Sequence, residues 1–166
     1  KAAWIKTNEA NYDLLCPLEL VEEVPKWWKA VGEWERVDLN IGYIDEGDII
    51  EKEQFVLEAF DTPHRPGSQG YKIKSDDSTI VYTGDTSFNK DLREIADGCD
   101  ILIHELSLPM KTELHTSPDE LIDLLQGVKI DKLVLVHFYP QIIPKLDDIS
   151  QEIEEKTGID TIIGED

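Results

Sequence analysis

The sequence is short of positive charge and has no long hydrophobic run. Its 166 residues include 16 Lys and Arg against 36 Asp and Glu, which leaves a formal net charge of −20 at pH 7. A surface this acidic repels phosphate backbones and anionic headgroups. We therefore expect neither nucleic acids nor membranes as partners. No apolar run approaches the roughly 18 residues that a membrane span needs.

Cysteine is equally scarce. The two cysteines, Cys16 and Cys99, lie far apart and form no C-x-x-C pair. This predicts reduced thiols, and therefore a reducing, cytoplasmic compartment. Residues 1–17 also lack the basic, apolar and small-residue regions of a signal peptide. With 40% hydrophobic residues, the composition is that of a globular chain, and residues 1–166 are expected to form a single domain.

The order of the expected elements predicts an α/β fold. Strands are expected at 34–44, 53–61, 70–75, 79–84, 100–105, 131–138 and 160–166. Helices are expected at 17–31, 89–98, 117–128 and 146–158. Pro25 should kink or break the first helix, whereas Ser117, Pro118 and Glu120 form a strong start for the third. From residue 79 onward strands alternate with helices, which indicates βαβ crossovers after an antiparallel first part.

Metal-seeking side chains follow three of these segments. His64 lies in the loop TPHRPGSQGY, Asp85 follows the apolar run IVYTG, and His137 ends the run VLVHF. Each alone is more often a core or turn residue, but three at the exit ends of separate segments form a constellation. Imidazoles and carboxylates are ligands of divalent metals, and one carboxylate can bridge two cations about 3.5–4 Å apart.

A second pair of side chains fits the same edge. Glu105 ends the strand DILIHE, and His115 leads the segment before the helix at 117–128. A carboxylate commonly orients an imidazole, so Glu105 is expected to orient His115. His104 precedes Glu105 on the same strand, so its side chain should point to the opposite face and stay outside the site.

With these segments the chain resembles the metallo-β-lactamase-fold hydrolase superfamily, from about Pro17 to about Pro140. The resemblance implies an αββα sandwich and two divalent metal ions, Zn²⁺ first and Fe or Mn as alternatives. It implies His64, Asp85 and His137 as metal ligands. In the branch that contains the tRNA 3′-processing nucleases (RNase Z), a HEA-type strand and an H-S-T-type segment supply a Glu–His pair. By that resemblance Glu105 and His115 are the catalytic residues.

The chain departs from the superfamily pattern in two ways. The H-x-H-x-D-H metal motif is absent, since the chain has only four histidines and none is in that pattern. We therefore expect this chain to be a C-terminal portion of the fold. Asp85 follows His64 by 21 positions, which leaves no room for the exosite arm of a tRNA processor. A small-molecule ester is therefore expected as substrate, and a homodimer stays open because dimers are common among similar hydrolases.

Three functions stay open. The first is a phosphodiesterase on small phosphodiesters, such as a cyclic nucleotide, using a hydroxide generated at a binuclear metal centre, with His115 protonating the leaving alkoxide. The second is a thioester or lactone hydrolase. Relatives of that kind generally lack the H-S-T-like segment, which here reads HTS. The third is a truncated, non-catalytic structural or interaction module, which the missing motif favours.

Overall fold

The computed structural model describes residues 10–30 and 37–165, and the chain divides into two compact units between Glu46 and Gly47. The first unit contains the strands β1 (Ala10–Cys16) and β2 (Val37–Tyr43). Their backbones pair in parallel as a two-stranded sheet. β1 was not predicted from the sequence. That the whole chain forms one domain stays a prediction.

The first unit also corrects the prediction for residues 17–31. Two helical segments occur here, η1 (Leu18–Leu20) and α1 (Glu23–Ala30). The break precedes Pro25, which lies in the first turn of α1 instead of kinking a longer helix. Proline is tolerated there because the first-turn N–H groups have no partner within the helix. Residue 31 and the first residues of the strand expected at 34–44 lie outside the described part.

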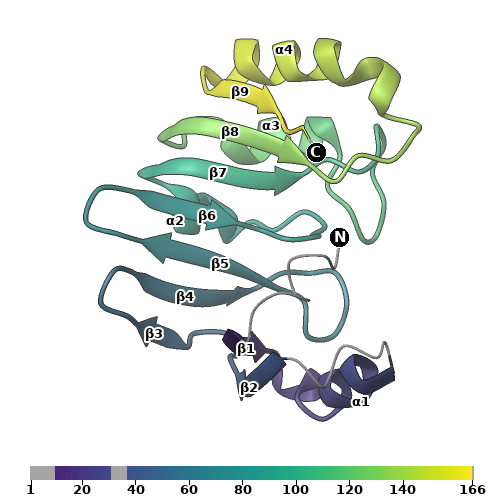
Figure 1. The fold of residues 1–166 in the computed structure, drawn as a ribbon. Helices are drawn as coiled ribbons and strands as arrows, with labels where there is room; N and C mark the ends of the chain where they lie inside the picture. Colours follow the sequence, from purple (N-terminus) through teal and green to yellow (C-terminus); the bar gives the residue numbers. More distant parts are fainter. Residues whose placement is uncertain (1–9, 31–36, 166) are drawn as a thin grey trace. The chain divides into compact units, whose positions relative to one another are not determined.

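The second unit is built on a seven-stranded sheet in the order β3-β4-β5-β6-β7-β8-β9 (Figure 1). Its strands are β3 (Ile49–Glu51), β4 (Val56–Asp61), β5 (Gln69–Lys74), β6 (Thr79–Tyr82), β7 (Cys99–Glu105), β8 (Ile130–Val136) and β9 (Asp160–Ile163). Pairing is antiparallel from β3 to β6 and parallel from β6 to β9. The switch at residue 79 confirms the predicted change from antiparallel strands to βαβ crossovers. The short strand β3 was not predicted.

The helices of the second unit are α2 (Leu92–Ala96), α3 (Pro118–Leu125), the 3-10 turn η3 (Ile143–Lys145) and α4 (Leu146–Thr157). In α3 the Ser117 side chain accepts from the Glu120 N–H while Glu120 reaches back to the Ser117 N–H, the capping box that the sequence predicted. α2 is shorter than the expected 89–98. The Asn89 side chain accepts from the Asp91 N–H and favours a turn there.

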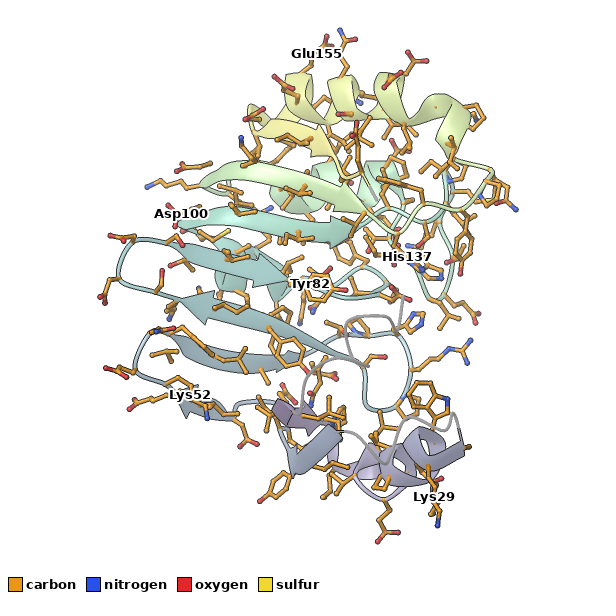
Figure 2. All side chains as sticks on the ribbon, in the orientation of Figure 1. Lys29, Lys52, Tyr82, Asp100, His137 and Glu155 are labelled. Atoms are coloured by element: carbon orange, nitrogen blue, oxygen red, sulfur yellow. The ribbon has the colours of Figure 1, made fainter. Side chains whose placement is uncertain are left out.

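The parallel strands all run in one direction, which defines two ends of the sheet. Asp100 lies near the start of β7, and His137 lies just beyond the end of β8, at the opposite end (Figure 2). In open α/β sheets, ligands bind beyond the carboxyl ends of the strands. The end marked by His137 is therefore where a site is expected.

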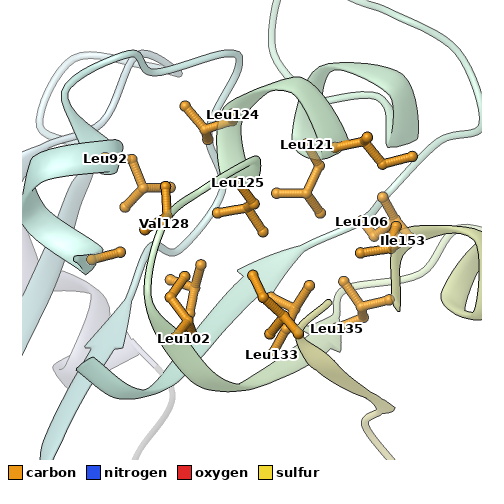
Figure 3. Close-up of a cluster of buried hydrophobic side chains, with 14 of the residues drawn as sticks. Leu92, Leu102, Leu106, Leu121, Leu124, Leu125, Val128, Leu133, Leu135 and Ile153 are labelled. Carbon is orange, nitrogen blue, oxygen red and sulfur yellow. The ribbon is translucent and has the colours of Figure 1, made fainter. Parts of the chain in front are cut away.

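One face of this sheet packs against the helices in a single hydrophobic core (Figure 3). Leu102 of β7, Leu133 of β8, and Leu121 and Leu125 of α3 have no exposed surface. Burying a leucine side chain contributes about 1.5–3 kcal/mol. This core fixes the lengths and register of β7 and β8, and with them the positions of the residues at their carboxyl ends.

Both cysteines are buried free thiols, in agreement with the expectation of reduced cysteine. Burial raises the pKa of the Cys99 thiol to about 11, so it stays protonated at neutral pH. No helix in the described ranges has both the length and the hydropathy of a membrane span. The cytoplasmic compartment stays a prediction.

Candidate metal centre

Five side chains with metal or proton chemistry gather at the carboxyl ends of β6, β7 and β8. His64 lies in the loop between β4 and β5, and Asp85 lies three residues after β6. Glu105 is the last residue of β7, and His137 directly follows β8. His115 lies in the loop before α3, with its ring centroid 5.1 Å from that of His64 and 5.8 Å from that of His137. The residues predicted from separate segments thus share one place.

Asp85 reaches the centre of this group through a sharp turn. Gly84 adopts a φ of 60°, in the left-handed region that glycine occupies without strain. Asp85 Oδ1 lies 3.0 Å from His137 Nδ1, and Oδ2 lies 3.9 Å from His64 Nε2. Each carboxylate oxygen therefore faces a different imidazole.

The hydrogen-bond partners of His64 and His115 determine which ring nitrogen carries the proton. His64 Nδ1 lies 2.8 Å from the Leu114 carbonyl oxygen, and His115 Nδ1 lies 2.7 Å from Glu105 Oε1. Both partners only accept hydrogen bonds, so Nδ1 is the donor in each ring. In the neutral imidazole this leaves the Nε2 lone pair free, and such a lone pair is what a metal ion binds.

His137 occupies a strained backbone conformation. Its φ of 62° is the single positive φ at a non-glycine residue in the described ranges, and such a conformation costs about 1–3 kcal/mol. Two hydrogen bonds between β7 and β8 hold the segment on either side: Leu106 N–H donates to Val136 O at 2.8 Å, and Tyr139 N–H donates to Ser107 O at 3.1 Å. The strand pairing therefore fixes the direction in which the imidazole leaves β8.

Both carboxylate oxygens of Glu105 accept two hydrogen bonds each. Its side chain is 1% exposed. Oε1 accepts from Thr86 N–H at 3.1 Å and from His115 Nδ1 at 2.7 Å, and Oε2 accepts from the Ser107 N–H at 3.0 Å and the Ser107 hydroxyl at 2.5 Å. A carboxylate has about four lone-pair sites. Glu105 therefore orients Thr86, Ser107 and His115.

The full occupancy of the Glu105 carboxylate distinguishes two candidate sets of metal ligands. By distance, the group whose ligand atoms all lie within 4.8 Å of one another in the described residues is Glu105, His115 and His137, which shares only His137 with the predicted ligand set. Glu105 could bind a cation only by giving up hydrogen bonds to buried donors, which costs about 1–3 kcal/mol for each donor left unpaired. Asp85 is 40% exposed and holds no such set of donors. The free acceptor capacity of Asp85 therefore favours His64, Asp85 and His137, which stay the predicted metal ligands.

Hydroxyl residues that the sequence analysis left unassigned join the loops to each other. The Thr116 N–H and hydroxyl both donate to Thr86 O at 2.9 Å, which ties the His115 loop to the Asp85 loop. The Ser87 N–H and hydroxyl both donate to Pro63 O, which ties the Asp85 loop to the His64 loop. Each hydroxyl follows a candidate site residue within two positions, and that adjacency was the available signal.

His104 lies on the other side of β7, as the alternation of the strand predicted. It is completely buried, and its Nδ1 contacts the Glu105 backbone oxygen at 2.5 Å. Its Nε2 has no hydrogen-bond partner. Burial lowers the pKa of His104, against the opposing effects of the Glu105 carbonyl and charge. A neutral imidazole among leucines is a core residue, so His104 stays outside the site.

Comparisons with known proteins identify relatives of this chain. A family model described as Anti-Pycsar protein Apyc1 matches residues 37–156. A UPF0173 metal-dependent hydrolase from Pyrobaculum islandicum is 29% identical over 139 residues, which cover 82% of this chain and 59% of the relative. The chain thus spans about three fifths of that relative's length.

Solved structures show the same fold. The metallo-beta-lactamase fold protein YhfI from Bacillus subtilis superposes with a TM-score of 0.79 at 15% identity, covering 93% of this chain and 63% of that one. Zn(2+)-bound PqqB from Methylobacterium extorquens superposes with a TM-score of 0.73 at 15% identity, covering 99% of this chain and 64% of that one. At these identities the likeness shows the fold alone, and it confirms the predicted fold class.

Proposed function

We propose, from the premise that this chain belongs to the Anti-Pycsar protein Apyc1 family and has the metallo-β-lactamase fold, that it is part of a metal-dependent hydrolase of small phosphodiesters. The observation that carries the proposal is the convergence of Asp85 with His64 and His137. One carboxylate faces two imidazoles through its two oxygens, at 3.0 Å and 3.9 Å. Two imidazoles and a carboxylate from separate loops are more than a core needs, and their nitrogen and oxygen donors suit divalent metal ions.

In this proposal His64, Asp85 and His137 would hold the metal ions. Zinc is the first choice, since imidazole and carboxylate suit it, and iron and manganese remain alternatives. When bound, such ions supply a water of lowered pKa as nucleophile and polarise the phosphoryl oxygens. Three side chains cannot fill two metal shells, so the proposal requires further ligands beyond these residues.

Glu105 and His115 would handle the proton. The Glu105 carboxylate accepts from His115 Nδ1 at 2.7 Å and so holds the ring with Nε2 directed away from it. When this imidazole is protonated, its second N–H is on Nε2. The Nε2 proton can then pass to the leaving alkoxide oxygen, a step that typically contributes about 10²–10⁴ in rate.

The substrate class follows from charge and from the short connection between His64 and Asp85. The hairpin of β5 and β6 occupies that connection, and no additional arm extends from it to grip a large nucleic acid. A net charge of −20 also opposes long polyanions. A small phosphodiester, such as a cyclic nucleotide, brings one phosphate to the site and avoids most of that repulsion.

Hydrolysis of a chromogenic phosphodiester tests this proposal against the alternatives. The protein, supplied with a segment that carries the missing H-x-H-x-D-H ligands and loaded with zinc or manganese, is assayed with bis(p-nitrophenyl) phosphate, a thioester and a lactone, and compared with His115→Ala. We expect saturable phosphodiester hydrolysis that falls about 10²–10⁴-fold in His115→Ala. Faster cleavage of the thioester or lactone would support the second function. Tight metal binding without any turnover would support the non-catalytic module.

A further inference from the structure

Tyr139 is an aromatic side chain that packs against two residues of the candidate site. It lies in the segment after β8, two residues beyond His137. Its ring centroid is 5.4 Å from that of His137 and 5.7 Å from that of His115, at interplanar angles of 73° and 68°. Aromatic rings favour such edge-to-face contacts. One ring therefore contacts both a proposed metal ligand and the proposed proton donor.

The backbone fixes the place of this ring. The Tyr139 N–H donates to Ser107 O at 3.1 Å, and the Tyr139 carbonyl accepts from the Ile142 N–H at 3.0 Å. Pro140 follows directly, and a proline restricts the backbone of the residue before it. The ring is therefore positioned before a substrate arrives, which lowers the cost of ordering it on binding.

Part of the Tyr139 side chain is open to a ligand. Tyr139 is 38% exposed, whereas His115 beside it is 7% exposed. A substrate that reaches the buried imidazole of His115 therefore passes an aromatic surface that is accessible from solvent.

The proposed reaction brings the leaving group to the same place. His115 Nε2 passes its proton to the leaving oxygen, so this oxygen must come within about 2.6–3.2 Å of Nε2. The phosphoryl group would be held at His64, Asp85 and His137. The group that the leaving oxygen carries is then close to both imidazoles against which Tyr139 packs.

An aromatic ring at this position favours a planar partner. A well-oriented pair of aromatic rings binds about 2–10-fold more tightly than apolar contact alone provides. Nucleobases stack on tyrosine rings in the same way. A leaving alcohol that carries a planar group would therefore gain a contact that a small alkyl alcohol lacks.

We propose that Tyr139 is a specificity-determining residue whose ring contacts the leaving group of the phosphodiester and favours an alcohol that carries a planar aromatic group. The proposal rests on the proposed function, because the place of the leaving group follows from the role of His115. A purely structural Tyr139 would only support the imidazoles and would favour no class of leaving group.

Binding calorimetry with phenyl phosphate and methyl phosphate separates the two roles. Each ligand carries one phosphate, and they differ in the planar group that would meet Tyr139. The zinc-loaded protein, supplied with a segment that carries the missing H-x-H-x-D-H ligands, is compared with Tyr139→Leu and Tyr139→Phe. We expect wild type to prefer phenyl phosphate, Tyr139→Leu to lose about 2–10-fold of that preference, and Tyr139→Phe to keep it because the ring remains.

Phe55→Leu is the matched control. Phe55 is also 38% exposed, and it directly precedes β4. Since β4 and β6 are both antiparallel to β5, β4 runs in the direction of β6 and starts at the end of the sheet away from the site. The preference for phenyl phosphate should therefore be the same in Phe55→Leu as in wild type.

Hydrolysis of bis(p-nitrophenyl) phosphate by the same proteins provides the second measurement. A contact with the leaving group that is made equally in the ground state and the transition state affects KM and not kcat. We therefore expect Tyr139→Leu to raise KM about 2–10-fold with kcat nearly unchanged. A structural role would instead lower kcat, because His115 would lose its support.

An equal loss of affinity for both phosphates in Tyr139→Leu would overturn the proposal, as would a wild type without any preference for phenyl phosphate. Loss of the preference in Tyr139→Phe would overturn it too, since the hydroxyl would then be the binding group. Failure of the proposed function has a different signature. In that case wild type would hydrolyse no phosphodiester, while its preference for phenyl phosphate would still depend on Tyr139.

Discussion

His104 and Glu105 are neighbours on β7, and both are buried polar side chains, yet the two faces of the strand treat them differently. On the helix-covered face, His104 Nε2 has no hydrogen-bond partner. On the other side, Glu105 uses both carboxylate oxygens twice. The core tolerates one unpaired nitrogen because the neutral ring is mainly a hydrophobic filler. The site cannot tolerate an unpaired carboxylate, because burying an uncompensated charge costs several kcal/mol.

The comparison teaches that burial at the end of β7 serves two different purposes. Around Leu102 and Leu133 it supplies stability. Around Glu105 it orients the site loops, since each hydrogen-bond donor to that carboxylate belongs to a loop that carries a candidate site residue. Variants on the helix-covered face should therefore change mainly the stability, and variants around Glu105 should also change metal binding.

The largest loss of stability is expected from a change on the helix-covered face of β7. Leu102→Ala removes a side chain with no exposed surface and should lower the free energy of unfolding by about 2–5 kcal/mol. Ile103→Ala removes the same number of atoms from the next residue, which is partly exposed, and should cost clearly less. Urea denaturation of both variants measures the difference. Equal losses would mean that the two faces are equally packed.

The second-largest loss of stability is expected from a change at Glu105. Glu105→Gln keeps the size of the side chain, but its amide nitrogen cannot accept from the buried donors that Glu105 now binds. Leaving such donors unpaired should lower the free energy of unfolding by about 1–3 kcal/mol. Urea denaturation at neutral pH measures this loss. A variant as stable as wild type would show that the hydrogen bonds around Glu105 are dispensable.

A smaller effect is expected from the cap of α3. Ser117→Ala removes the side-chain acceptor of the capping box and should cost about 1 kcal/mol in stability. The zinc affinity should stay unchanged, because Thr116 still holds the His115 loop through its two hydrogen bonds to Thr86. Denaturation and calorimetry on the same sample check both statements. A parallel loss of zinc binding would show that the helix cap, and not Thr116, positions His115.

The smallest effect near neutral pH is expected at His104. Burial lowers its folded pKa from the ordinary value of 6.5, so the unfolded chain binds more protons between the two values. The contribution to stability is fully present above the unfolded pKa and is lost as the pH falls below it, by up to about 1.4 kcal/mol per pH unit. His104→Leu should therefore match wild type near neutrality and show a flatter loss of stability below about pH 6.5. Identical pH profiles would mean that His104 does not contribute.

The sequence predicted the parallel part of the sheet and α3 and α4 well, because apolar runs and a capping box are local signals. It missed β1, whose pairing with β2 is a long-range contact, and β3, which has only three residues. It placed the break of the first helix at Pro25, although proline is compatible with a first turn.

The candidate site shows the same limit. Residues with distinctive chemistry, such as Asp85 and His137, were identified by type and by their place after apolar runs. Ser107, Thr86 and Thr116 were not, because a hydroxyl or a backbone N–H acquires its partner only when the strands bring distant loops together. The roles of the site residues stay predictions that metal binding can test.

Zinc calorimetry on wild type, Asp85→Asn and Glu105→Gln, with the same metal-free buffer, tests the central claim most directly. If Asp85 is a ligand and Glu105 only orients its neighbours, Asp85→Asn should abolish measurable zinc binding, whereas Glu105→Gln should weaken it about 10–100-fold. The reverse order, with zinc retained in Asp85→Asn and lost in Glu105→Gln, would contradict the account. It would place the metal on Glu105, His115 and His137 instead.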